Sequence, residues 1–365
     1  MATMTQQRVF NFSAGPAVLP LPVLEQVRDE MLSYGDAGAS VLEISHRSAQ
    51  FASILEDAKA RLTRLLSIPD SHEVLFMQGG SRLQFSMIPM NLLRGAASAD
   101  YIVTGSWTKK AVAEAKKEGT VNVIWDGKEG NYNRLPSNDE LNVDPNSAYL
   151  YYTSNETIQG VQFLSEPECG DVPLICDASS DFMCRDLPIE KYGMVYACAQ
   201  KNAGPAGVTA AIIRKDLLDR GSEDLPGYCH FKSHADNGSM FNTPPTFAIY
   251  VLGLVAKWLE DQGGLDAMEK RNREKSELLY STIDQDDFFT GHAEQASRSL
   301  MNVTFTLPND ELQAKFVSEA AEHNLCSLKG HRSVGGVRAS IYNAMPAEGV
   351  QALRDFMIDF RTRNG

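Results

Sequence analysis

Short apolar runs alternate with amphipathic helical stretches through most of the chain, and this alternation limits the possible folds more than any other feature. Such an alternation is typical of a mostly parallel sheet with helices packed on both of its faces. We therefore predict an α/β fold. The expected strands of its central sheet lie at residues 74–77, 100–104, 121–125, 148–153, 172–176, 194–198 and 208–213. We also expect a helix at 21–34, a short extended run at 40–44 and a long loop at 222–246.

The pattern changes after Gly263-Gly264. Beyond this pair, the sequence predicts helices at 265–284, 310–322 and 346–361, and strands at 300–307 and 337–342. A chain of 365 residues is long enough for one large domain and a smaller one. We expect an N-terminal segment (1–16) that packs near the small domain, a large domain (17–263) and a small α+β C-terminal domain (264–365).

Composition excludes several classes of partner. The formal net charge of −13 disfavours nucleic acid and anionic membrane surfaces. Six cysteines occur without a C-x-x-C pair, which supports no metal site and fits free thiols in a reducing compartment. The N-terminus has no signal or transit pattern, and the most apolar stretch, 247–259, is too short to span a bilayer. We expect a cytoplasmic protein that binds neither membrane nor nucleic acid.

A lysine stands at the exit of one predicted strand. Residues 194–207 read MVYACAQKNAGPAG, so Lys201 follows an apolar run and precedes a loop rich in glycine and proline. A charged amine is costly to bury unless it is used. We interpret Lys201 as the residue that forms a Schiff base with pyridoxal 5′-phosphate (PLP). The alternative is a surface lysine that merely ends a strand, so other residues must support the interpretation.

Three other strand exits carry groups that PLP chemistry needs. Asp177 precedes Lys201 by 24 residues (201 − 177), about one crossover, which predicts that the two lie at neighbouring strand ends. An acid beside the pyridine nitrogen keeps the cofactor electron-withdrawing, although Asp177 also suits a helix N-cap. Trp107 suits stacking on the cofactor ring, and Thr157 suits donation to its phenolic oxygen. The alternatives are a core tryptophan and a turn or capping threonine.

A glycine-rich turn is the predicted phosphate site. Its residues, Gly79-Gly80-Ser81-Arg82, lie between a predicted strand and a predicted helix. Small residues and a helix N-terminus favour a phosphate there, and Ser81 and Arg82 add a hydroxyl donor and a positive fork. The turn matches neither a Walker A loop nor G-x-G-x-x-G, which disfavours dinucleotides. An ordinary turn between strand and helix is the alternative.

Basic residues elsewhere indicate a doubly anionic substrate. They are His46, Arg47, His331, Arg332 and Arg338. In an acidic protein such groups suit a substrate with a carboxylate and a second anion, because an arginine can bind either group bidentately. Solvated surface charge is the alternative for any one of them.

Longer motifs extend this pattern from about residue 11 to about residue 357. They are NFSAGPA at 11, SVLEISHRS at 40, MQGGSRLQFSMIPMNLL at 77, TGSWTKKA at 104, YYTSNETIQGVQF at 151, DASSDFMCR at 177, YACAQKNAGPAG at 196, HADNGSMFNTPPTFAIYVLGL at 234 and GHRSVGGVRASIYNAM at 330. In these motifs the chain resembles the phosphoserine aminotransferases, PLP-dependent enzymes of fold type I in the class V aminotransferase family.

The resemblance implies a role for each matching residue. Lys201 would bind PLP, and Asp177 would pair with its pyridine nitrogen. The cofactor-binding residues would be Gly80, Ser81, Arg82, Trp107, Thr157, Asp177, Gln200 and Lys201, with Asn242 and Thr243 reaching the cofactor phosphate from the other subunit. The substrate-binding residues would be Ser13, His46, Arg47, His331, Arg332 and Arg338.

The resemblance also implies a reaction and an assembly. O-phospho-L-serine and 2-oxoglutarate would be converted reversibly to 3-phosphohydroxypyruvate and L-glutamate in L-serine biosynthesis. Lys201 would act as general base and acid, and the enzyme would be a homodimer with shared active sites. Two alternatives stay open. One is another fold type I PLP enzyme, such as a different aminotransferase or a cysteine desulfurase using Cys326; the other is a non-catalytic binding protein on this fold.

Overall fold

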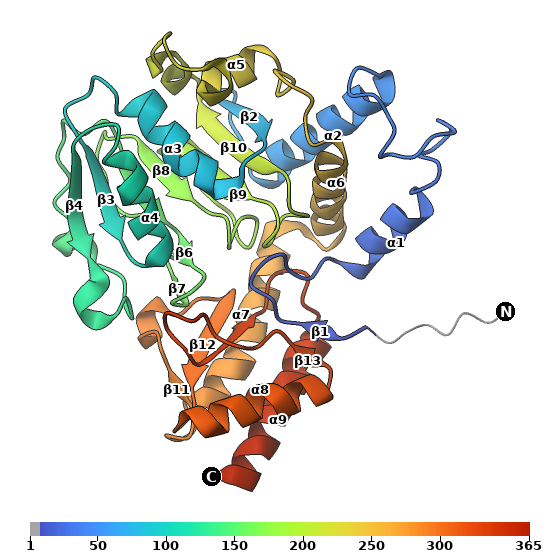
Figure 1. Ribbon diagram of the computed structural model, residues 1–365, viewed down its shortest axis with the longest axis vertical. Coiled ribbons are helices and arrows are strands. Elements are labelled where there is room, and N and C mark those ends of the chain that lie inside the picture. Colours follow the sequence, from blue (N-terminus) through green and yellow to red (C-terminus); the bar gives the residue numbers. More distant parts are fainter. Residues whose placement is uncertain (1–7) are drawn as a thin grey trace.

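A seven-stranded sheet forms the centre of the molecule. The computed structural model describes residues 8–365, so the part of the predicted N-terminal segment before residue 8 lies outside the described residues. The strand order is β2-β10-β9-β8-β5-β3-β4 (Figure 1). The strands are β2 (His72–Met77), β3 (Ala99–Val103), β4 (Val121–Asp126), β5 (Leu150–Thr153), β8 (Leu174–Asp177), β9 (Tyr192–Cys198) and β10 (Thr209–Arg214).

The sheet is mostly parallel, as the sequence predicts. β4, β3, β5, β8 and β9 run parallel to one another, whereas β10 is antiparallel to both β9 and β2. Only residues 199–208 connect β9 to β10, which is too short for the helical crossover that a parallel pair needs. The ends of β2, β9, β8, β5 and β3 therefore meet at one edge of the sheet.

Helices cover both faces of this sheet (Figure 1). Successive strand residues point to opposite faces, so Val74 and Phe76 join one apolar core while Leu75 and Met77 join another. The first core also contains α1 (Leu21–Asp29), α2 (Ala49–Leu65) and α6 (Thr246–Asp261). The second contains α3 (Gly80–Leu92) and α4 (Ser106–Ala115). Burial of strands on both faces explains why their sequences are almost continuously apolar.

A third core lies below the large sheet in Figure 1. It packs helices α7 (Gly264–Ile283), α8 (Asp310–Glu322) and α9 (Ala347–Asn364) against a sheet of β11 (Thr290–Gly291), β12 (Asn302–Thr306) and β14 (Val337–Ser340). β1 (Phe10–Asn11) pairs in parallel with β13 (Leu325–Cys326), so the N-terminal segment lies against this part. The predicted break at 263–264 falls where α6 gives way to α7. The domain division itself stays a prediction.

Three local predictions need correction. Residues 40–44 form turns rather than an extended run, because the Ser40 hydroxyl accepts from Leu42 N and Glu43 N donates to Ser40 O. The helix expected at 21–34 ends at Asp29, ahead of Gly35, which has a φ of +52°. The loop expected at 222–246 contains the short helix α5 (Phe231–Asp236).

Within residues 8–365, every helix is too short or too polar to cross a bilayer.

Candidate active site

Lys201 lies at the strand edge beside two predicted partners. Its Nζ donates to Thr157 Oγ1 at 2.6 Å and lies 5.2 Å from the centre of the Trp107 ring. Thr157 lies in the turn between β6 (Asn155–Glu156) and β7 (Val161–Gln162), a two-stranded ribbon that extends from the end of β5. The Lys201 amine therefore lies close to Thr157 and Trp107, which follow the ends of two other strands.

Asp177 ends β8, the parallel neighbour of β9, as the spacing predicts. Its side chain is 3% exposed, and Oδ1 accepts from Ser179 N at 2.9 Å. Burial raises the pKa of Asp177, while the positive charge of Lys201 lowers it. Among the residues that the structure describes, Asp177 makes no ion pair. A buried carboxylate of this kind calls for a cationic hydrogen-bond donor.

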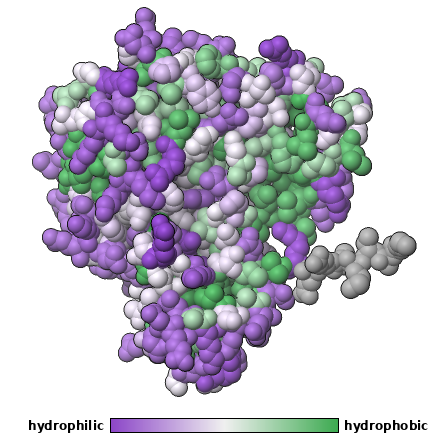
Figure 2. All heavy atoms as spheres, in the orientation of Figure 1, coloured by the Kyte–Doolittle hydropathy of each residue, from purple (hydrophilic) through white to green (hydrophobic). Residues whose placement is uncertain are grey.

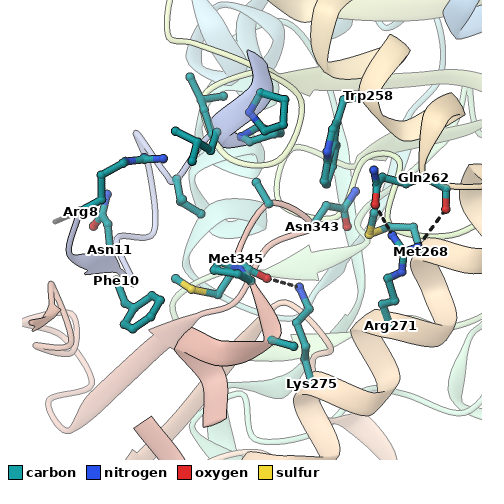
Figure 3. A pocket seen from close by; sticks show the side chains of 18 of the residues that line it. Arg8, Phe10, Asn11, Trp258, Gln262, Met268, Arg271, Lys275, Asn343 and Met345 are labelled. Atoms are coloured by element: carbon teal, nitrogen blue, oxygen red, sulfur yellow. Dashed lines mark hydrogen bonds between the residues drawn. The ribbon is translucent and has the colours of Figure 1, made fainter. Parts of the chain in front are cut away.

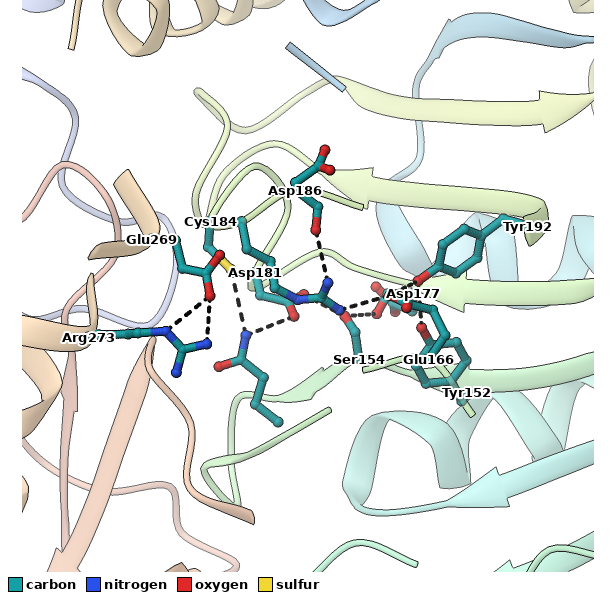
Figure 4. A network of polar contacts seen from close by, with 12 residues as sticks. Tyr152, Ser154, Glu166, Asp177, Asp181, Cys184, Asp186, Tyr192, Glu269 and Arg273 are labelled. Atoms are coloured by element: carbon teal, nitrogen blue, oxygen red, sulfur yellow. Dashed lines mark hydrogen bonds and ion pairs between the residues drawn. The ribbon is translucent and has the colours of Figure 1, made fainter. Parts of the chain in front are cut away.

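A polar network behind Asp177 fixes the local backbone (Figure 4). Ser154 N and Oγ both donate to Asp177 O, and Ser154 Oγ also donates to Asp181. Gln162 Nε2 donates to the second Asp181 oxygen at 3.1 Å. Burial raises the pKa of Asp181 to about 6. This network holds the end of β8 in place without supplying a cation to Asp177.

The turn at 79–82 begins α3 directly after β2. Gly79 and Gly80 have φ values of +89° and +62°, a region that favours glycine. Ser81 Oγ lies 2.8 Å from Ser179 Oγ, which in turn accepts from Cys198 N at 3.1 Å. The sequence did not single out Ser179 as a site residue; its signal was only the polar run DASSD after β8. Ser179 thus connects the predicted phosphate turn to the ends of β8 and β9.

Glu156 is a second residue that the sequence did not single out. It is fully buried, and its carboxylate accepts from Trp107 N and Thr108 N at the start of α4. Burial raises the pKa of Glu156, whereas these hydrogen bonds lower it. An acid at a helix N-terminus is favourable, and here it orients Trp107. The Trp107 indole Nε1 is buried without a hydrogen-bond partner among the described residues.

The N-terminal turn at 13–16 packs against Lys201. Gly15 has a φ of +141°, and a Cβ added to it would lie 3.1 Å from Lys201 Cγ. Ala17 N donates to Gln200 O at 2.9 Å, and Tyr342 OH donates to Ala14 O. The predicted residues Ser13 and Gln200 therefore belong to segments that lie at the lysine.

Several basic residues around Lys201 shift one another's pKa values. The positive charges of Arg82, Arg332 and Lys201 each lower the pKa of Lys110 on α4, after the larger effect of its burial. Burial also lowers the pKa of His331, and the charges of Arg338, Lys110 and Arg332 lower it further. Among residues 8–365 none of the arginines and lysines named here forms an ion pair with a carboxylate. Lys110 is the third residue that sequence reasoning missed.

Four other predicted residues lie apart from this group. His46, Arg47, Asn242 and Thr243 line a separate pocket of about 430 Å³ that none of the other predicted site residues lines. Asn242 Nδ2 donates to the side chain of Gln78, at the end of β2. Within one chain, the structure therefore brings the predicted residues together in two groups rather than one.

A cavity of about 580 Å³ beside α7 is lined by none of the predicted site residues (Figure 3). On its wall the Lys275 amine donates to the carbonyls of Ile341, Tyr342 and Met345, and burial lowers its pKa to about 7. The turn that it binds also donates Asn343 N to the Asn202 side chain, next to Lys201. Lys275 thus supports the lysine loop from behind.

A lysine and an acid at adjacent parallel strand ends, below a glycine turn, define the class of PLP-dependent transferases. The chain belongs to the class-V aminotransferase family, whose model matches residues 9–353. PLP is accordingly its cofactor. The residues around Lys201 fit this group, because Asp177 offers a buried carboxylate with no ion-pair partner among the described residues and Trp107 offers the flat face of its ring.

Comparison with known proteins gives relatives over the whole chain. A phosphoserine aminotransferase of Rhodopirellula baltica is 63% identical over 98% of this chain and 96% of its own length. One from Desulfatibacillum aliphaticivorans is 50% identical over 99% and 100%. The solved phosphoserine aminotransferase of Bacillus circulans subsp. alkalophilus has a TM-score of 0.97 and 46% identity, covering 99% of this chain and 100% of that one. The PLP-bound enzyme of Trichomonas vaginalis has a TM-score of 0.92 and 41% identity, covering 96% and 100%.

Proposed function

We propose that this chain is a phosphoserine aminotransferase of L-serine biosynthesis. It transfers the amino group of O-phospho-L-serine to 2-oxoglutarate, reversibly, and yields 3-phosphohydroxypyruvate and L-glutamate. The observation that carries the proposal is Lys201 beside Asp177, near a cluster of basic residues that form no ion pair within residues 8–365. The names of the relatives support the choice of substrate.

Two groups of residues would hold the cofactor. Lys201 would bind it covalently, Asp177 would face its pyridine nitrogen, Trp107 would stack on its ring and Thr157 would donate to its phenolic oxygen. Its phosphate would be bound by Gly80, Ser81, Arg82 and Gln200, with Asn242 and Thr243 of the partner subunit. When bound, PLP supplies an electron sink for the charge that develops at the substrate Cα.

Lys201 performs the proton transfers. With cofactor and substrate bound, Lys201 Nζ would remove the proton from the substrate Cα as a general base and would later return a proton as a general acid. Thr157 Oγ1, at 2.6 Å, holds the amine in the site. The N-terminal turn around Gly15 packs on the aliphatic part of the lysine and so shields it from water.

The basic residues bind the two anionic ends of the substrates. Ser13, His331, Arg332 and Arg338 would receive the carboxylate and the distal anion, which is a phosphate in one substrate and a side-chain carboxylate in the other. Arginine suits both because its fork binds either group bidentately. Burial lowers the pKa of Arg338, and a bound anion would compensate for that cost.

The second pocket supports a homodimer with shared sites. His46, Arg47, Asn242 and Thr243 would complete the partner's site rather than their own, which explains why one chain leaves them apart from Lys201. Figure 2 shows apolar residues gathered on the side that carries α1 and α6. Exposed apolar side chains near this side or beside the pocket include Leu21, Leu32, Leu42, Met240 and Phe241. A contiguous apolar surface of this kind is typical of an interface.

Hybrid dimers test this arrangement. Lys201→Ala and Arg47→Ala chains, each inactive at low substrate, are unfolded together and refolded as a mixture. If Arg47 acts in the partner's site, each hybrid dimer contains one intact site, and about a quarter of wild-type activity should return after random exchange. The two variants refolded separately are the control. No gain in the mixture would place Arg47 in the same site as the Lys201 of its own chain.

A substrate assay tests the function itself. Holoenzyme mixed with O-phospho-L-serine, without a keto acid, should convert its cofactor to pyridoxamine phosphate, followed by absorbance. L-serine, which lacks the phosphate, and L-aspartate, whose side chain is shorter, should react at least ~100-fold more slowly, because the distal anion is absent or out of reach. Equal rates for serine and phosphoserine would contradict the proposal and point to another aminotransferase.

Two further features bear on the alternatives and the compartment. Cys326 lies in β13, whose backbone pairs with β1, whereas a cysteine desulfurase needs a mobile cysteine. This disfavours the desulfurase. All six cysteines are free in the structure, which supports our proposal that the protein works in the reducing cytoplasm.

A further inference from the structure

Lys110 is a basic residue of the site that the binding roles above leave unused. It lies on α4, three positions after Trp107, so both side chains emerge on one face of the helix. Its Nζ is 4.0 Å from the centre of the Trp107 ring. A cation held over an indole is stabilised and oriented by the ring, and the same ring lies 5.2 Å from Lys201 Nζ.

Basic residues of both predicted anion-binding groups act on Lys110. Arg82 lies in the first turn of α3, and Arg332 in the loop before β14; the charge of each lowers the pKa of Lys110. Lys110 in turn lowers the pKa of His331. The carboxylate of Glu156 acts in the opposite direction, but it already accepts from backbone N–H groups of α4. Like charges are brought this close in an acidic protein only at a cost, and a bound anion removes that cost.

A matched comparison is available on the same helix. Lys109 precedes Lys110 and is exposed, whereas Lys110 is half-buried. Lys109 is therefore an ordinary surface lysine on the solvent-facing side of α4. Lys110 differs from it in facing the site rather than solvent.

We propose that Lys110 binds the phosphate of the phosphoserine substrate and favours this dianion over the side-chain carboxylate of glutamate. The inference rests on the proposed function and deepens it. A lysine acts as a compact point charge that a phosphate with three oxygens can approach from several directions, and an added charge benefits a dianion more than a monoanion. Lys110 lies over the Trp107 ring rather than in the glycine turn. Because that turn offers its own hydroxyl, guanidinium and helix N-terminus to the cofactor phosphate, we assign Lys110 to the substrate phosphate.

The test compares Lys110→Met with Lys109→Met and with Lys110→Arg as the conservative variant. In Lys110→Met, kcat/KM for O-phospho-L-serine should fall about 30-fold, while kcat/KM for L-glutamate falls less than about threefold. Lys110→Arg should recover most of the loss, and Lys109→Met should match wild type. A readout without turnover is the dissociation constant of inorganic phosphate for the holoenzyme, measured by tryptophan fluorescence. It should rise about tenfold in Lys110→Met only.

Three results would overturn the inference. Equal losses for phosphoserine and glutamate would remove any preference for phosphate. Unchanged phosphate binding in Lys110→Met would remove Lys110 from the anion site. Loss of PLP from Lys110→Met during dialysis would assign the lysine to the cofactor phosphate instead. A wild type that does not use phosphoserine would overturn the proposed function, and the phosphate titration would then still decide whether Lys110 binds an anion.

Discussion

Replacing Lys201 with alanine is expected to lower kcat about 10⁴-fold and to leave the fold unchanged. In the proposed mechanism the Lys201 amine carries the proton, and it lies 2.6 Å from Thr157 Oγ1 and 5.2 Å from the centre of the Trp107 ring. The side chain is half-buried in a loop, so its loss removes little apolar packing. The cofactor would remain bound through Asp177 and the phosphate turn, without a covalent link.

Two measurements check this result. Single-turnover rates with O-phospho-L-serine give the loss of the proton transfer, and the absorbance of bound PLP gives the loss of the covalent link. Added methylamine should restore part of the rate, because it supplies an amine of the missing kind. Lys109→Ala, on an exposed face of α4, is the control. A Lys201→Ala variant with more than a tenth of wild-type kcat would exclude Lys201 as the base.

The alternation of apolar runs was sufficient to predict the central sheet. Strands buried on both faces are nearly continuously apolar, so β5, β8 and β9 are recognisable without a structure. The antiparallel direction of β10 was not predicted, because an apolar run does not encode its direction. The turns at 40–44 were missed for another reason. Hydrogen bonds between Ser40, Leu42 and Glu43 override the extended conformation that Val41 and Leu42 favour.

The spacing of Asp177 and Lys201 correctly placed them at neighbouring strand ends, because a single crossover separates consecutive parallel strands. Glu156, Ser179 and Lys110 could not be found in this way. A glutamate after a strand reads as a turn residue, and a lysine on a helix reads as a solvated charge. Their roles depend on residues far away in the sequence: Glu156 accepts from the first turn of α4, and the charge of Arg82 lowers the pKa of Lys110.

The two groups of site residues show a further limit of reasoning from one chain. His46 and Arg47 match the substrate-site motif, yet the structure places them in a pocket away from Lys201. A sequence pattern identifies which residues act together but not which subunit supplies them. In the proposed homodimer, a twofold axis would let one surface of the chain complete the site of its partner.

Asp177→Asn is expected to lower kcat about 10³-fold, because it removes the buried negative charge that keeps the cofactor ring electron-withdrawing. Asparagine has nearly the same shape, and its carbonyl oxygen can still accept from Ser179 N. Binding and packing should therefore change little, and the loss should appear in kcat rather than KM. Single-turnover kinetics with O-phospho-L-serine measure it.

The same variant gives an opposite result for stability. Burial raises the pKa of Asp177, so the folded cofactor-free protein holds this proton more tightly than the unfolded chain does. Above the unfolded pKa, and therefore at pH 7, the ionised carboxylate costs stability. Asparagine removes that cost, so the Tm of the cofactor-free variant should equal or exceed that of wild type.

Asp181→Asn separates the charge of Asp177 from the general loss of a buried acid. The Asp181 carboxylate accepts from Ser154 Oγ on one oxygen and from Gln162 Nε2 on the other, so the NH₂ group of asparagine would leave one of these donors without an acceptor. Burial raises the pKa of Asp181 as well, but here we expect the lost hydrogen bond to outweigh the removal of the buried charge. This control should lower Tm and keep kcat within about fivefold of wild type. If Asp177→Asn instead lowered Tm and preserved kcat, Asp177 would be a structural acid like Asp181. The opposite responses at two buried aspartates four positions apart would show that the fold tolerates an unpaired charge at Asp177 because the reaction uses it.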